Sequence, residues 1–156
     1  RTMEKKILKG IAVGLALLVM TLFVLYVNRS DPYGILPGKQ LVGEEATEPI
    51  DDWNFVQQYR RVIVEVRPSD PYSVFAGYFL MEKDLYISSA QSRWAQFLRE
   101  DPNIRIRLGE KIYPVRAIQI EDPVRLEEVH QGYTGKYPNR TMEQAVGRWF
   151  FRIESR

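Results

Sequence analysis

The sequence contains no cysteine and only one histidine, His130, and these shortages exclude several kinds of site. Without cysteine there is neither a disulfide framework nor a thiolate metal site. A single histidine leaves no imidazole cluster of the kind that zinc and iron sites need. The 22 Lys and Arg residues nearly balance the 20 Asp and Glu residues, whereas nucleic-acid-binding domains normally have a clear basic excess. We therefore expect no metal site and no nucleic-acid partner.

The longest hydrophobic run, residues 10–27, has no charged side chain. With its flank from Ile7 it predicts a helix about 30 Å long, which matches the hydrocarbon core of a bilayer. A cleaved signal peptide has a shorter apolar region that ends in small residues, whereas this run ends in Tyr26 and Val27. We predict a single transmembrane helix over residues 10–27, or 7–27 with its flanks, that anchors the chain in the lipid bilayer.

Positive residues are unequally distributed around this helix. Four precede it and two follow it soon after, namely Arg1, Lys5, Lys6 and Lys9 before it and Arg29 and Lys39 after it. The positive-inside rule then predicts a cytoplasmic N-terminal flank, residues 1–9. The C-terminal domain is expected to be periplasmic or extracellular.

Gly10 and Gly14 form a GxxxG pattern in the hydrophobic run. This spacing lets two membrane helices approach closely, although glycine is also common in membrane helices that do not pair. Both interpretations are open. If the glycines are helix-packing residues, the helix contacts other membrane subunits or a second copy of the chain in a homodimer.

Residues 28–52 are rich in proline, glycine and acidic residues, which is typical of an extended linker. A solvated spacer is favoured, and a strap that binds a partner is the alternative. Residues 53–156 then form one mainly-β domain. Alternating and β-branched runs predict strands at 61–67, 74–81, 85–87, 104–108, 112–120 and 148–153, with helices at 91–100 and after Asp122.

Several short motifs occur in a characteristic order. They are Leu85-Tyr86-Ile87-Ser88-Ser89, Trp94, Phe97-Leu98, Asp101-Pro102-Asn103, Ile104-Arg105-Ile106, Tyr113-Pro114-Val115-Arg116-Ala117 and Lys136-Tyr137. Over residues 62–137 this order resembles the split β-barrel family of flavin- and deazaflavin-binding reductases, which are pyridoxamine-phosphate-oxidase-like or deazaflavin-dependent nitroreductase-like. The resemblance implies a six-stranded split β-barrel with two or three short helices. It also implies a flavin or deazaflavin, a quinone-like or other small acceptor, and often a dimer.

The cofactor-binding candidates, if a flavin is bound, lie where a predicted strand gives way to a helix, because backbone amides there can contact an anion. They are Ser88, Ser89, Gln91, Arg93 and Trp94. A helix cap and a core tryptophan are the favoured alternative. Deazaflavin enzymes hold the cofactor phosphate with a basic, glycine-containing turn, but this chain has Arg67-Pro68-Ser69-Asp70-Pro71 there. The phosphate motif is therefore not preserved, because the prolines lack N–H donors and Asp70 repels an anion.

Three arginines on the predicted hairpin, Arg105, Arg107 and Arg116, allow a basic patch for an anion. A solvated strand face is favoured for the first two. His130 is expected on the surface or packed against a helix.

Two functions remain, and no catalytic residue is assigned for either. In the first, the chain is a membrane-anchored accessory subunit of a membrane complex, and its extracytoplasmic barrel is a docking or stabilising module without a cofactor. In the alternative, the chain is a membrane-tethered reductase that uses FMN or a deazaflavin to reduce a quinone-like or small acceptor.

Overall fold

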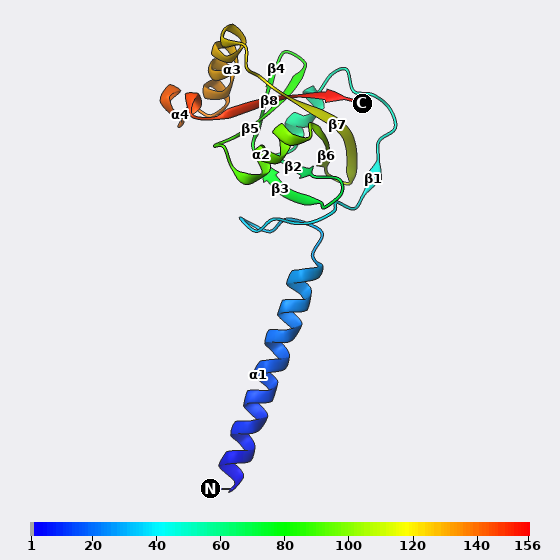
Figure 1. The fold of residues 1–156 in the computed structure, drawn as a ribbon, viewed down its shortest axis with the longest axis vertical. Coiled ribbons are helices and arrows are strands. Elements are labelled where there is room, and N and C mark those ends of the chain that lie inside the picture. Colours follow the sequence, from blue (N-terminus) through cyan, green and yellow to red (C-terminus); the bar gives the residue numbers. More distant parts are fainter. Residues whose placement is uncertain (1) are drawn as a thin grey trace.

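The computed structural model describes residues 2–156 and shows a long helix below a β-rich domain (Figure 1). This helix, α1 (Thr2–Asn28), contains the predicted hydrophobic run. From Met3 to Asn28 it is long and apolar enough to cross a membrane, and none of its most apolar part is buried against the rest of the chain.

The domain is built on one curled sheet, whose strands follow the order β3-β2-β6-β7-β8-β5-β4, with β1 added beside β7. The strands are β1 (Glu44–Glu45), β2 (Val62–Val66), β3 (Tyr72–Ala76), β4 (Tyr78–Met81), β5 (Asp84–Ser89), β6 (Asn103–Leu108), β7 (Lys111–Gln119) and β8 (Trp149–Ser155). All neighbouring pairs are antiparallel except β1 with β7.

A single residue, Gly77, separates β3 from β4, which lie at opposite ends of the strand order. β3 pairs with β2 and β4 pairs with β5, so the two are halves of one bent strand. Counting them together, six strands enclose the core, and the predicted six-stranded split β-barrel is confirmed. A Cβ at Gly77 would lie only 3.0 Å from the Tyr137 hydroxyl, which donates to the carbonyl of Tyr78 at 2.8 Å.

The interior of the barrel follows from period-two alternation along its strands. Val62, Val64 and Val66 of β2 are fully buried, and the isoleucines of β6 meet them from the neighbouring strand. The helix α2 (Arg93–Glu100) adds Ala95 and Leu98 to this core. A short 3₁₀ turn, η1 (Asn54–Gln58), contributes Val56.

Two further helices, α3 (Pro123–Lys136) and α4 (Met142–Val146), enclose a second hydrophobic cluster outside the barrel. The helix predicted after Asp122 is α3, and Asp122 caps it by accepting the N–H of Arg125 at 2.8 Å. On β8, Phe151 faces the barrel core, whereas Phe150 belongs to the outer cluster with Phe79 and Tyr133. The adjacent aromatics of β8 are therefore covered on both faces by the chain itself.

Candidate functional site

Residues 29–46, which we call the strap, run from the end of α1 along the barrel (Figure 1). Glu65 on β2 is only 4% exposed and accepts bonds from Nε and Nη2 of Arg105 at 2.8 and 2.7 Å. The same carboxylate accepts the N–H of Leu41, and Arg105 donates to the Leu41 carbonyl at 3.2 Å. The hydrogen bond to Glu65 raises the pKa of Arg105, whose desolvation acts in the opposite direction. This pair fixes the middle of the strap, where the Leu41 side chain is buried.

Arg107 holds the strap two residues further along β6. Its guanidinium makes two bonds to the Asp31 carboxylate, at 2.9 and 2.7 Å, and a third to the carbonyl of Val42 at 3.1 Å. The interpretation of Arg105 and Arg107 as a solvated strand face is therefore wrong. The sequence could not reveal this, because the residues that bind the two arginines lie at least 40 positions away along the chain.

Backbone pairing attaches the strap to the barrel at two further points. Gly38 exchanges two hydrogen bonds with Ser73 of β3, at 2.8 and 3.0 Å. A Cβ at Gly38 would overlap the carbonyl oxygen of Ser30, so only glycine fits. At the C-terminal end of the strap, Ala46 donates to the carbonyl of Ile112 at 2.7 Å beside the β1–β7 pairing. A solvated spacer was favoured for residues 28–52, but residues 29–46 of it are bonded to the chain's own barrel.

The first two cofactor candidates, Ser88 and Ser89, lie buried at the end of β5. The hydroxyl of Ser89 lies 2.5 Å from that of Ser92 and accepts the N–H of Ser92 at 3.1 Å. Arg148 donates to the hydroxyl and the carbonyl of Ser88, at 3.2 and 3.3 Å. Both hydroxyls therefore have partners inside the protein, and Arg148 is a neighbour that the sequence did not indicate.

The other three candidates, Gln91, Arg93 and Trp94, have different surroundings. Gln91 is exposed and adopts a positive φ of 56°, and its amide reaches the carbonyl of Gly147 at 3.5 Å. Trp94 packs partly buried against the barrel core. Arg93 is exposed, and its guanidinium lies 5.6 Å from the ring centre of Phe97. Ser88 and Ser89 follow one another on β5 and bond to different partners, Arg148 and Ser92, and the structure does not gather the five residues around one hollow.

The β2–β3 turn carries the residues expected to replace a phosphate-binding motif. Arg67 has a positive φ of 57° and forms an ion pair with Asp70, three residues on. The Arg67 guanidinium also lies over the Phe97 ring, 4.4 Å from its centre. Tyr72 packs edge-on against the same ring, with 5.7 Å between centres. The positive charge of this turn is neutralised by its own carboxylate, and two aromatic rings pack between the turn and α2.

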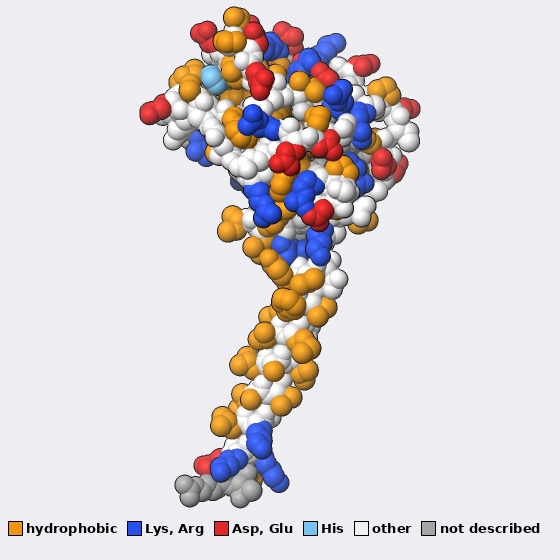
Figure 2. All heavy atoms as spheres, viewed as in Figure 1, with side chains coloured by type: hydrophobic (Ala, Val, Ile, Leu, Met, Phe, Trp, Pro, Cys, Tyr) orange, Lys and Arg blue, Asp and Glu red, His pale blue; other side chains and the backbone are white. Residues whose placement is uncertain are grey.

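A hollow of about 550 Å³ lies at the junction of α1, the strap and the β2–β3 turn. Arg29 forms part of its wall and donates to the carbonyls of Tyr26, at 2.6 Å, and Pro37. Its guanidinium also stacks on the Tyr26 ring at 3.9 Å. Basic and hydrophobic side chains gather at this junction (Figure 2). The lining residues are Tyr26, Val27, Arg29, Pro37, Gly38, Lys39, Gln40, Asp70, Pro71 and Tyr72, and none of them is a sequence-predicted cofactor candidate.

The remaining singled-out residue, His130, packs on the ring of Phe150 with 5.4 Å between ring centres. His130 is half-buried on α3, and its ring partner belongs to strand β8, so it is neither fully exposed nor packed against a second helix. Among residues 2–156, no group of three or more His, Asp or Glu side chains is arranged to hold a metal ion.

No protein-family model matches this chain, and no curated protein matches its sequence. Solved structures do match the fold. A provisionally named pyridoxamine 5′-phosphate oxidase from Listeria innocua is 14% identical with a TM-score of 0.51, over 64% of this chain and 86% of that one. A hypothetical protein from Mycobacterium tuberculosis is 18% identical with a TM-score of 0.52, over 72% and 86%.

A provisionally named 5-nitroimidazole antibiotic resistance protein from Bacteroides thetaiotaomicron is 14% identical with a TM-score of 0.50, over 79% of this chain and 89% of that one. At these identities the likeness establishes the fold. The C-terminal domain is a split β-barrel of the kind that the sequence motifs resemble.

Proposed function

We propose that this chain is a membrane-anchored split-barrel protein whose barrel serves as a docking or stabilising module of a membrane complex. The attachment of the barrel to α1 is the observation that carries the proposal. The chain leaves α1 at Asn28, and Arg29 at once bonds to the carbonyl of Pro37 on the strap. Asp31 and Leu41 then bind arginines of β6.

A flexible tether would let the barrel move freely relative to α1. Here the residues that would form such a tether are bonded to the barrel instead. The strap thus keeps the barrel close to the end of α1, and in this proposal the same face of the barrel meets a neighbouring subunit in the bilayer. In this proposal α1 spans the membrane, and its GxxxG face provides the contact with other subunits or a second copy.

The residues present do not fit a flavin phosphate, and this supports a module without a cofactor. An anion site needs free donors, but the hydroxyls of Ser88 and Ser89 are already bonded within the protein. Arg67, the cation of the β2–β3 turn, is paired with Asp70.

A membrane-tethered flavin or deazaflavin reductase is the second candidate. The observation in its favour is the fold likeness to the proteins named as a pyridoxamine 5′-phosphate oxidase and a nitroimidazole resistance protein. A shared fold does not establish a shared reaction, because the same barrel can hold unrelated sites.

Titration of the full-length chain in detergent with FMN, followed by flavin fluorescence, distinguishes the two candidates. The docking module should show no saturable binding. Saturation at about 1 µM FMN, a binding free energy of about −8 kcal/mol, would replace it with the reductase. Native-gel migration of the chain extracted from its own membranes supplies the second measurement. The docking proposal requires a species larger than one or two copies of the chain.

A further inference from the structure

Residues 32–37, which we call the neck loop, carry exposed hydrophobic side chains at the base of the barrel. Tyr33 is 78% exposed and Ile35 is fully exposed. The backbone N–H and C=O groups of Tyr33 and Leu36 bond to one another at 3.0 and 2.9 Å, and Gly34 has a positive φ of 57°. This is a tight turn with an isoleucine at its tip, where glycine relieves the strain of the left-handed backbone.

The turn is held in place from both sides. Pro32 is buried, and Arg29 donates to the carbonyl of Pro37. Lys39 donates its N–H to the carbonyl of Ser30 at 2.7 Å, which closes the loop at its base. The exposure of Ile35 is therefore a property of an ordered, braced turn.

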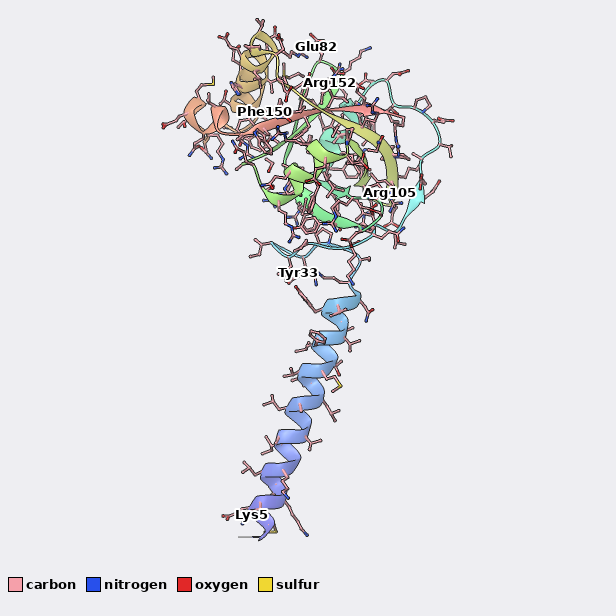
Figure 3. The ribbon with its side chains drawn as sticks, viewed as in Figure 1. Lys5, Tyr33, Glu82, Arg105, Phe150 and Arg152 are labelled. Atoms are coloured by element: carbon pink, nitrogen blue, oxygen red, sulfur yellow. The ribbon has the colours of Figure 1, made fainter. Side chains whose placement is uncertain are left out.

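The neck loop lies at the level where α1 ends. Figure 1 shows it beside the top of α1, between the helix and the barrel, and Figure 3 labels Tyr33 at this junction. Tyr26 and Val27, on the last turns of α1, line the same hollow as Pro37, so apolar surface continues from the helix to the loop. Arg29 and Lys39 also line the hollow, and Lys and Arg side chains gather at this junction (Figure 2).

We propose that the neck loop is a second contact with the membrane. Tyr33 and Ile35 enter the interfacial layer of the leaflet from which α1 emerges, and Arg29 and Lys39 lie among its lipid phosphates. Tyrosine favours this layer, and basic residues beside a spanning helix favour anionic headgroups. The inference rests on the proposed function in one respect, which is that α1 spans the bilayer. Two contacts would then fix the tilt of the barrel as well as its distance from the membrane.

The absence of native cysteine allows a direct test by single nitroxide labels on the full-length chain. Three variants are needed, and all replace exposed side chains. Ile35→Cys reports the neck loop and Leu18→Cys reports the middle of α1. Val124→Cys is the matched control, because it is 71% exposed and lies on α3, at the end of the domain away from α1 (Figure 1).

Each variant is reconstituted into vesicles of equal parts phosphatidylcholine and phosphatidylglycerol, and collision rates with oxygen and with a water-soluble nickel chelate are measured. The ratio of oxygen to nickel collisions at position 35 should exceed that at position 124 several-fold and remain below that at position 18. A water-like ratio at position 18 would show that the anchor itself has failed. A membrane-like ratio at position 18 with equal, water-like ratios at 35 and 124 would overturn the neck-loop contact alone.

Discussion

Glu65 and Arg105 are directly opposite each other on β2 and β6, and together they bind both backbone polar groups of Leu41. The carboxylate accepts the Leu41 N–H, while the guanidinium donates to the Leu41 carbonyl. Arg105 keeps 21% of its side chain exposed, whereas Glu65 is almost fully buried. Loss of either partner leaves a buried charge and a backbone group without its bond.

Glu65→Ala should lower the free energy of unfolding by about 2–3 kcal/mol, since it removes one half of a largely buried ion pair. The strap should then become cleavable near Leu41. Chemical denaturation and limited proteolysis of the full chain in detergent measure both effects. Arg152→Ala is the control, because its ion pairs with Asp84 and Glu154 are far more exposed than that of Glu65 and should be worth less than about 1 kcal/mol. Equal losses in the two variants would contradict the role of Glu65.

Gly38→Ala should displace the strap from β3, because the new Cβ would overlap the backbone of Ser30. We expect cleavage near Gly38 and a lower Tm. The control is Gly135→Ala in α3, where a Cβ meets nothing within 4 Å and alanine is the better helix former. A protease-resistant Gly38→Ala variant would show that the contact with Ser73 is dispensable.

The barrel was predictable because its signals are local. Period-two alternation in residues 104–108 and 112–120 marks the β6–β7 hairpin, and Asp122 with Pro123 marks the start of α3. The strap has no such signal. Its proline, glycine and acidic residues look the same in a free linker, and only the folded barrel brings Asp31 to Arg107. Leu41 is buried, but the same stretch also holds Ile35 and Val42, which are exposed, so the sequence alone does not single Leu41 out.

The candidate site was predictable only in part, for the same reason. Strand and helix boundaries correctly located Ser88 and Ser89 at the end of β5. The partner of Ser88, Arg148, follows sixty residues later and is brought beside it by the pairing of β5 with β8. The hollow at the junction with α1 also combines distant segments, so no pattern in the sequence could predict it.

Stability should fall at alkaline pH, with Tyr78 as one cause. Its hydroxyl donates to the carbonyls of Val56 and Tyr59, at 2.8 and 2.5 Å, and burial raises its pKa. Above about pH 10 the tyrosine of the unfolded chain loses its proton first, which favours unfolding. The stabilisation is therefore complete below that pH and is lost as the pH rises through the folded-state pKa.

Tyr78→Phe should flatten this alkaline loss in denaturation curves recorded across that pH range, although it lowers stability at neutral pH by about 1–2 kcal/mol. Tyr33→Phe removes an exposed hydroxyl and is the control. If the free energy of unfolding of Tyr78→Phe falls with rising pH as steeply as that of the parent chain, groups other than Tyr78 cause the loss.

The orientation of the chain is a separate prediction from the positive residues before α1. With residues 1–9 in the cytoplasm, a cysteine at the exposed position of Thr47 should react with an impermeant maleimide on cells whose outer permeability barrier has been opened. Thr2→Cys, on the opposite side, should react only after lysis. The reverse pattern would place the barrel in the cytoplasm.

Gly14→Leu tests whether α1 packs against another membrane helix. A Cβ at Gly10 or Gly14 meets nothing within 4 Å, so the chain alone tolerates a larger side chain at either position. Any effect of the substitution must come from a partner helix, whose close approach a leucine would block. We expect a several-fold loss of the associated form on native gels, with unchanged unfolding of the barrel.

Ala16→Leu adds similar bulk two residues along, about 200° around the helix, and should leave association intact. If both variants associate like the parent chain, Gly10 and Gly14 are ordinary residues of a membrane helix.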